Sequence, residues 1–361
     1  MRKIYGIFRG FPGLGRVSAG IALLKDLEKQ GYQIGAISYY QGSSALRKQG
    51  IPILLEYEPE DRDITSIGIN PITEFSSKVA ECIKEGEPDI IIFDGEPLLQ
   101  SVLGDVFPKS KMISLLNPSD LYNETLPEFK INFYHKNYLA CGNAIVHGIG
   151  LENETVAMGE CNVYHIPTII REEVLSISSS YKASKRIVGI LGGGSVNSSK
   201  SFIKSTVDMG VKIASIAKIM NQYDFDIYCN DDYIKQEIEG RIKEVANVEI
   251  ISNYTAPKDI YDSACFAIVR AGRNVASELL YLNIPGLLIA TDGDYRSQEQ
   301  EKNIRLMIEV GDTLFDKFTL LEDDISIVNK INTMIEGRTR EKLIHPGNEI
   351  SIDIIKKVLE E

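Results

Sequence analysis

Apolar and polar positions change between two spacings along the whole chain. Short apolar runs typical of buried strands are followed by longer stretches with helical spacing, and glycine-rich turns lie between several of them. In the first half the pattern predicts strands at 3–8, 33–38, 51–55, 89–93, 112–116 and 144–147, with helices such as 17–29 and 73–84 between them. Strands that alternate with helices are typical of βαβ units and parallel sheets.

The second half repeats this scheme. Strands are predicted at 186–191, 225–229, 248–251, 264–269 and 286–290, with a glycine-rich turn at 192–195, a long helix to about 220 and an amphipathic helix at 352–359. The segment 165–185 contains Pro167 and a serine cluster and has no clear period, which is typical of a linker. We therefore expect an α/β protein with two Rossmann-like domains, 1–164 and 186–340, that face each other across a cleft, and a C-terminal helix in 341–361.

Composition narrows the function classes. The 361 residues carry 39 Lys and Arg against 51 Asp and Glu, a net charge of −12, which argues against a nucleic-acid partner and against general attraction to anionic lipid. The five cysteines form no C-x-x-C pair, so neither a zinc site nor a disulfide framework is indicated, and reduced thiols in the cytoplasm are expected. We find no signal-peptide pattern and no apolar run of about 18 residues.

Both glycine-rich turns of the second half fall at the carboxyl ends of predicted strands, where open α/β sheets bind ligands. Gly193, Gly194 and Ser195 precede a helix, so the backbone and the free N–H groups of the helix start suit a diphosphate. The alternative is a tight turn without a ligand, with Ser195 as a helix cap.

The second turn offers a similar arrangement. Gly272, Arg273 and Asn274 open a helix after the strand 264–269, and their N–H groups suit a phosphate. Glu278, one turn further on, can accept two hydrogen bonds from a ribose diol, or it is a solvated glutamate favoured by the helix dipole.

The loop after the strand 286–290 is rich in acids and amides, including Asp294, Glu299 and Gln300. Such side chains suit sugar hydroxyls, which need donors and acceptors together. The alternative is a polar loop that caps the next helix.

Residues 267–311 resemble the C-terminal domain of glycosyltransferase family 28, the MurG-type transferases. The matching positions are Arg270, Gly272, Glu278, Pro285, Glu299, Gln300 and Asn303, whereas Ala271, Asn274 and Val275 depart from the family pattern. The resemblance implies the GT-B fold, a ribose contact at Glu278 and contacts to the transferred sugar at Glu299 and Gln300. It also places Tyr254 and Thr255 near the nucleotide base.

The N-terminal half carries a weaker resemblance. Residues 13–16 look like the family's G-x-G-H turn, which puts Gly13 and Gly15 on the acceptor side, but Arg16 stands where the family has histidine. An arginine stays protonated and is a poor base, so Arg16 is expected to bind an anionic acceptor or the donor phosphate, or to form only a surface salt bridge. His135, in the aromatic stretch 132–138, is a candidate for the acceptor side or an ordinary, partly exposed histidine.

Residues 93–97 resemble the D-x-E-P turn of some related transferases. Asp94 ends a predicted strand and is the candidate general base, with Glu96 as the next candidate; the alternative is helix capping.

Together these observations predict a metal-independent glycosyltransferase without a cofactor, and the family resemblance implies inversion at the anomeric carbon. The donor that the resemblance implies is a UDP-sugar, and a glycan, a lipid-linked glycan or a small molecule is the acceptor, with peripheral membrane contact left open. The alternatives are a nucleotide-sugar hydrolase or epimerase on the same scaffold, and a non-catalytic nucleotide-sugar-binding subunit.

Overall fold

The fold is described from a computed structural model of residues 1–361, in which 1–10, 14–65, 67–123, 126–177, 184–192, 199–252, 256–291, 297–336 and 343–361 are the described residues. The chain divides into two compact units, unit 1 (Met1–Glu172 with Pro346–Glu361) and unit 2 (Glu173–His345). Helix α7 (Glu172–Leu175) lies at the boundary in the sequence.

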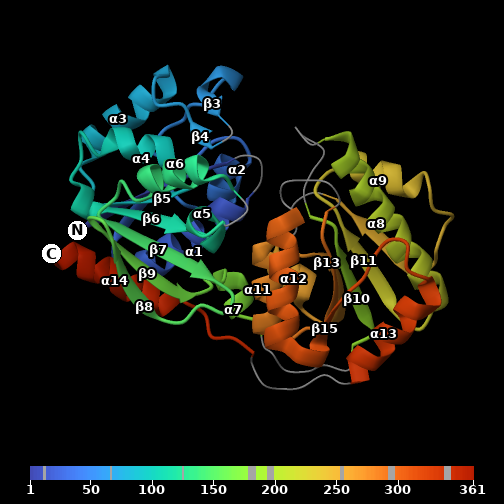
Figure 1. Cartoon of the computed structure of the whole chain (residues 1–361). Helices are drawn as coiled ribbons and strands as arrows, with labels where there is room; N and C mark the ends of the chain where they lie inside the picture. Colours follow the sequence, from blue (N-terminus) through green and yellow to red (C-terminus); the bar gives the residue numbers. More distant parts are fainter. Residues whose placement is uncertain are drawn as a thin grey trace. The chain divides into compact units, whose positions relative to one another are not determined.

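Unit 1 is built on a seven-stranded sheet (Figure 1). Its strand order is β2 (Gln33–Ile37), β1 (Lys3–Phe8), β5 (Ile90–Asp94), β6 (Met112–Leu116), β7 (Asn143–Gly148), β9 (Cys161–Pro167) and β8 (Glu154–Met158). All neighbouring strands are parallel except β8, which is antiparallel to β9. A two-stranded hairpin, β3 (Ile64–Thr65) and β4 (Gly68–Ile69), lies outside this sheet.

The helices of unit 1 cover both faces of its sheet because successive strand residues point to opposite faces. Ile4 and Phe8 belong to a core cluster with α1 (Gly15–Lys29) and α14 (Asn348–Glu360), whereas Tyr5 and Ile7 belong to a cluster with α3 (Glu74–Gly86) and α4 (Pro97–Leu103). The remaining helices are α2 (Gln41–Lys48), α5 (Pro118–Leu121) and α6 (Glu128–Tyr138).

The C-terminal helix α14 returns to unit 1, so that the two chain ends are neighbours (Figure 1). Arg2 donates to the carbonyl of Leu359 at 3.1 Å. Asn348, at the start of the helix, exchanges hydrogen bonds with the backbone N–H and C=O of Ile170 at 2.9 and 3.0 Å and donates to Asp26 at 3.1 Å.

Unit 2 contains a fully parallel six-stranded sheet. Its strand order is β12 (Val248–Ile251), β11 (Asp224–Tyr228), β10 (Arg186–Ile190), β13 (Ala264–Arg270), β14 (Gly286–Ile289) and β15 (Phe315–Lys317). Its helices are α8 (Lys200–Ile219), α9 (Asp232–Glu239), α10 (Pro257–Tyr261), α11 (Arg273–Leu282), α12 (Ser297–Gly311) and α13 (Asp324–Glu336). One core cluster joins β10, β11, β13 and β14 to α8, α9 and α13.

Candidate functional site

In the main sheet of each unit there is one strand from which the chain continues first to the neighbour on one side and later to the neighbour on the other side. In unit 1, β1 lies between β2 and β5, and in unit 2, β10 lies between β11 and β13. Ligands of open parallel sheets bind beyond the carboxyl ends of the strands at such a point. The turns that follow β1 and β5 in unit 1, and β10 and β13 in unit 2, are therefore the candidate sites, and most of the residues expected from the sequence lie in or next to them.

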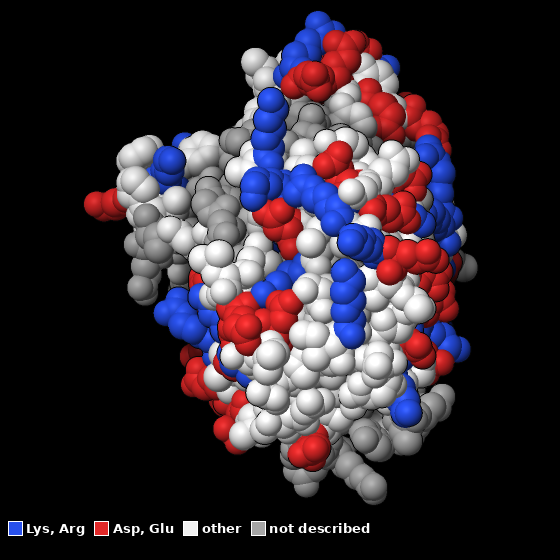
Figure 2. Space-filling view, turned by 90° about the vertical axis from the view of Figure 1, so that its right-hand side faces the viewer, with Lys and Arg blue, Asp and Glu red and all other residues white. Residues whose placement is uncertain are grey.

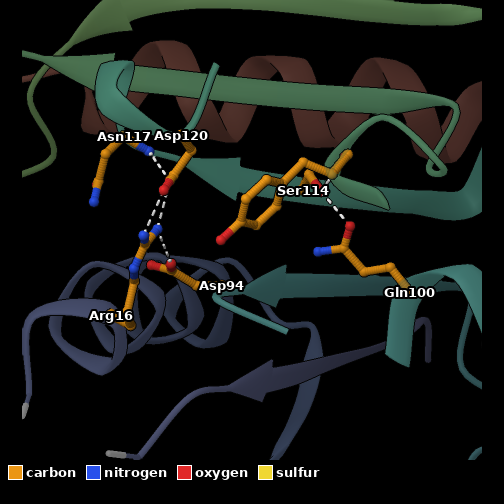
Figure 3. A network of polar contacts seen from close by, with 7 residues as sticks. Arg16, Asp94, Gln100, Ser114, Asn117 and Asp120 are labelled. Carbon is orange, nitrogen blue, oxygen red and sulfur yellow. Dashed lines mark hydrogen bonds and ion pairs between the residues drawn. The ribbon is translucent and has the colours of Figure 1, made fainter. Parts of the chain in front are cut away.

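Unit 1 carries a three-residue ion-pair cluster at this point. Asp94, the last residue of β5, accepts a hydrogen bond from Arg16 Nη1 at 3.1 Å. Asp120, on α5, accepts from Nη1 and Nη2 of the same guanidinium, both at 2.6 Å, and its Oδ2 also accepts from the backbone N–H of Asn117 at 2.8 Å. Figure 3 shows Arg16 between the two carboxylates. Arg16 therefore forms an ion pair within unit 1.

The three side chains of this cluster are largely buried. The side chains of Asp94 and Asp120 are 1% and 9% exposed, and that of Arg16 is 22% exposed. Burial alone would lower the pKa of Arg16, but the neighbouring charges, with Asp120 foremost, raise it well above its usual value. Burial and then the Asp120 charge raise the pKa of Tyr138. Arg16 therefore stays a cation and Tyr138 stays neutral, which leaves the carboxylates as the candidate bases.

The turn after β5 brings β1 and β5 together. The backbone N–H of Arg9 donates to the carbonyl of Asp94 at 2.9 Å. Gly95 has a φ of +82°, and a Cβ there would lie 2.9 Å from Arg9 Cβ and 3.2 Å from Arg16 Cγ. Only glycine fits this close, left-handed turn without displacing the two arginines.

Glu96 lies beside the cluster but faces a different part of unit 1. Its carboxylate is fully buried; Oε1 accepts from the Tyr39 hydroxyl at 2.8 Å and Oε2 from the backbone N–H of Ile69 at 2.7 Å. Burial raises the pKa of Glu96 from 4.5 to about 7, and the two hydrogen bonds oppose that shift. Its position shows that Glu96 fastens the β3–β4 hairpin to the end of β5.

The other acceptor-side candidates are Gly13, Gly15 and His135. A Cβ added at Gly15, at the start of α1, would meet none of the described residues within 4 Å. His135 Nε2 donates to the carbonyl of Leu121 at 2.7 Å and so connects α6 to α5. Gly13 lies outside the described residues.

Unit 2 places a buried arginine at the equivalent point. Arg270, the last residue of β13, is 5% exposed, and its guanidinium lies 4.5 Å from the centre of the Phe202 ring. Its Nη1 donates to Thr206 Oγ1 at 3.0 Å and to the carbonyl of Gly192 at 3.5 Å. Gly192, with a φ of +59°, begins the glycine-rich turn. Arg270 therefore links the ends of β10 and β13 and carries a positive charge beneath them.

Helix α11 begins directly after this arginine. Gly272 is its N-cap, with φ −67° and ψ 148°, and makes no side-chain cap. Among the described residues, a Cβ at Gly272 would meet nothing within 4 Å, and Arg273 and Asn274 are half-buried. The first N–H groups of a helix and its dipole attract anions.

Two amide side chains fix the neighbouring strand ends. Gln300 Oε1 accepts from the backbone N–H of Thr291 at 2.6 Å, and Asn303 Nδ2 donates to the carbonyl of Ala271 at 2.9 Å. Both amides come from α12, so α12, β13 and β14 converge next to the start of α11. Glu299 is half-buried on the same helix.

Glu278 lies further along α11 and is 2% exposed. Its Oε2 accepts from the Tyr261 hydroxyl of α10 at 2.7 Å. The structure thus gives this carboxylate a fixed orientation that the sequence did not reveal.

Several candidates lie outside the described residues: Gly193, Gly194, Ser195, Tyr254, Thr255 and Asp294. Among the described candidates, Arg16 and Asp94 come together in unit 1, and Gly272, Arg273, Asn274 and Gln300 lie around the ends of β13 and β14 in unit 2. Asp120 was missed from the sequence. Its available signal is the capping box of α5, in which Asn117 and Asp120 follow a buried strand.

Several surface charges around α8, α9 and α13 form ion pairs. Lys204 and Arg241 contact Asp208 at 2.5 and 3.1 Å, and Lys212 contacts Asp324 at 2.5 Å. Figure 2 shows the face on the right of Figure 1, where basic side chains lie next to acidic ones. Within the described residues, no helix is long and apolar enough to span a membrane.

We compared the chain with known protein families and sequences. No family model matches the chain. The chain is 24% identical over 356 residues, 94% of its length and 92% of the relative's, to the UDP-N-acetylglucosamine--N-acetylmuramyl-(pentapeptide) pyrophosphoryl-undecaprenol N-acetylglucosamine transferase of Clostridium botulinum (strain 657 / Type Ba4).

Solved structures agree over the whole chain. MurG of Acinetobacter baumannii superposes with a TM-score of 0.58 at 14% identity, covering 99% of this chain and 100% of that one. MnaA of S. aureus in its structure with UDP gives a TM-score of 0.63 at 13% identity, covering 100% and 97%. The chain thus has the GT-B fold and is a distant, full-length relative of the MurG-type transferases of glycosyltransferase family 28.

Proposed function

We propose that the protein transfers a sugar from a UDP-sugar to the hydroxyl group of an acceptor. The observation that carries this proposal is the open N-terminus of α11 at the direction change of the unit 2 sheet, next to a buried arginine and to the amides of α12. A uridine diphosphate donor is the choice that the named relatives support, because the C. botulinum relative is named for UDP-N-acetylglucosamine.

The diphosphate would lie at the start of α11, with Gly272, Arg273 and Asn274 offering backbone N–H groups. Gly193, Gly194 and Ser195 remain proposed diphosphate contacts. Arg270 adds a buried positive charge beneath the turns. As the bond to the sugar breaks, negative charge grows on the leaving diphosphate, and fixed dipoles and charges of this kind stabilise it.

The nucleoside and the sugar would bind to the remaining candidates. Glu278, oriented by Tyr261, accepts hydrogen bonds from the ribose diol. Gln300 uses its oxygen to hold Thr291, so its amide nitrogen is the group that donates to a sugar hydroxyl, whereas the carboxylates of Glu299 and Asp294 would accept from sugar hydroxyls. Tyr254 and Thr255 remain the proposed base contacts.

In unit 1, Asp94 is the proposed general base, and Gly15 is proposed to lie on the acceptor side. The acceptor oxygen forms a bond to the anomeric carbon while the bond from that carbon to the diphosphate oxygen breaks. The electron pair leaves with UDP, and the acceptor proton passes to Asp94. Glu96 is committed to the β3–β4 hairpin, and His135 to Leu121, which makes both weaker candidates for contact with the acceptor. Inversion at the anomeric carbon and independence of a metal ion are carried over from the family resemblance.

The donor site can be tested at Gly272, where an added Cβ would meet none of the described residues within 4 Å. Asp and Asn are both favourable N-caps, so Gly272→Asp and Gly272→Asn should fold equally well. Only Asp places a negative charge where the diphosphate binds. Calorimetric titration with UDP should give a dissociation constant at least about 10-fold weaker for the Asp variant than for the Asn variant, the scale of a charge at a helix end. Equal affinities would remove the diphosphate from this helix.

A further inference from the structure

Asp120 holds Arg16 far more closely than Asp94 does. Two guanidinium nitrogens lie 2.6 Å from the two oxygens of Asp120, whereas Asp94 has one contact at 3.1 Å. A two-bond arrangement of this kind is the strong, oriented form of the arginine–carboxylate pair. Asp120 is held in turn by the N–H of Asn117, so the direction of Arg16 is set from α5.

Asp94 is surrounded by charges from several elements. Besides Arg16 and Asp120, it interacts electrostatically with Tyr138 at the end of α6 and with Glu96 on its own turn. Arg9, after β1, acts on the same Tyr138 and Glu96. Arg16 contacts the proposed base directly, and an unopposed positive charge at 3.1 Å would hold Asp94 in its ionised form and make it a weak base.

We propose that Asp120 is a positioning residue that neutralises Arg16 and so leaves Asp94 able to take the acceptor proton. This inference rests on the proposed function, in which Asp94 receives the proton as the acceptor oxygen bonds to the anomeric carbon. It also accounts for an arginine at position 16. The Arg16–Asp120 pair has almost no net charge, so Arg16 can orient Asp94 without making it a weaker base.

Removing either charge of the Arg16–Asp120 pair should move the acid limb of the kcat/KM profile in a direction set by the sign of that charge. In Asp120→Asn the positive charge of Arg16 is opposed by Asp94 alone, so Asp94 binds its proton less readily. The acid limb of the kcat/KM profile should move to lower pH by about 1 unit, the low end of the effect of one nearby opposite charge, and kcat on the plateau should fall. Arg16→Gln should move the limb to higher pH, and the double variant, which removes one charge of each sign, should lie close to wild type.

The experiment measures kcat/KM against pH and the UDP dissociation constant for these three variants, for Asp94→Asn and for the wild type. The expected result is limbs displaced in opposite directions in the two single variants, with UDP affinity unchanged. A loss of activity in Asp120→Asn that is equal at every pH, without displacement of the limb, would overturn the inference and leave Asp120 a structural residue. If Asp120→Asn does not fold, the comparison of Arg16→Gln with the double variant decides, because the two differ only in the charge of Asp120; limbs at the same pH in both would overturn the inference.

A second readout separates this inference from the proposed function. Carboxyl ¹³C NMR with labelled aspartate, assigned by the signal lost in Asp94→Asn, follows the proton on Asp94 without any turnover. If the wild type transfers no sugar, the proposed function fails, but Asp94 should still titrate at lower pH in Asp120→Asn than in the wild type. Identical Asp94 titration curves in the two proteins would contradict the inference whatever the activity.

Discussion

Replacing Glu96 with glutamine removes a carboxylate that the fold buries completely. In the folded protein its pKa is raised from 4.5 to about 7, chiefly by burial. The folded state therefore holds this proton more tightly than the unfolded state does. This proton therefore adds to the free energy of unfolding. The contribution is fully present below the pKa that Glu96 has in the unfolded chain and is lost as the pH rises through its pKa in the folded protein.

The size of the effect follows from the shift. At about 1.4 kcal/mol per pKa unit, the shift corresponds to roughly 3 kcal/mol, of which about 2.5 kcal/mol is lost between about pH 5 and about pH 8. Glutamine has no such dependence. It can accept from only one of the two donors, Tyr39 and Ile69, which costs about 1–3 kcal/mol at every pH. The constant cost cancels when each protein is compared with itself at two pH values.

The assay is urea unfolding of the wild type and of Glu96→Gln at both pH values, with the exposed Glu81→Gln of α3 as the matched control. The stability of the wild type relative to Glu96→Gln should fall by about 2–3 kcal/mol from the lower to the higher pH, while Glu81→Gln should follow the wild type. The same pH dependence in the wild type and in Glu96→Gln would refute the reasoning and show that Glu96 stays ionised in the fold.

Four further predictions concern the sites and the C-terminal helix. Asp94→Asn should lower kcat by about 10²–10⁴ with donor affinity unchanged, because an amide cannot take the proton; near wild-type turnover in a steady-state assay would reduce Asp94 to an ion-pair partner of Arg16. Glu278→Ala should weaken UDP-sugar binding by about 1.5–3 kcal/mol in calorimetry, and an unchanged dissociation constant in a folded variant would exclude the ribose contact. Gln300→Ala should weaken binding of the intact UDP-sugar while the affinity for UDP changes little. Equal losses of affinity for both ligands in the same titrations would place Gln300 away from the sugar. Asn348→Ala should lower the free energy of unfolding by about 1–3 kcal/mol in urea, because it leaves the backbone of Ile170 without its partner; an unchanged midpoint would show that α14 does not depend on this side chain.

The central strands and the turns at their ends could be predicted from the sequence because inner parallel strands are continuous apolar runs. The expected strand at 112–116 coincides with β6, and the helix expected at 17–29 is α1, which begins two residues earlier. The GT-B fold inferred from the family resemblance is confirmed by the comparisons.

Elements with weak apolar patterns were not predicted correctly. Strand β8 is mostly exposed and lacks a buried face, and β9 extends into the segment expected to be a linker. The strand expected at 51–55 is reduced to a single bridge between Ala36 and Ile53. Local sequence carries little information where few side chains are buried.

Long-range pairings could not be predicted either. Asp120 is 104 residues from Arg16 in the sequence, and Asn348 is 178 residues from Ile170. Glu278 was expected from the family motif, but its partner Tyr261 lies on another helix and carries no motif of its own. Sequence patterns identified the turns at which chemistry is expected, and tertiary structure determines which side chains act on each other there.

The most direct test of the central claim is product analysis with a UDP-sugar labelled in the sugar. The wild-type protein is incubated with labelled UDP-N-acetylglucosamine and a panel of hydroxyl acceptors, and UDP, free sugar, isomerised donor and labelled acceptor are separated and counted. The proposed function predicts label on an acceptor and one UDP released for each sugar transferred, with this product lost in Asp94→Asn. Label found only as free sugar or as isomerised donor, or donor that remains unchanged with every acceptor, would contradict a glycosyltransferase.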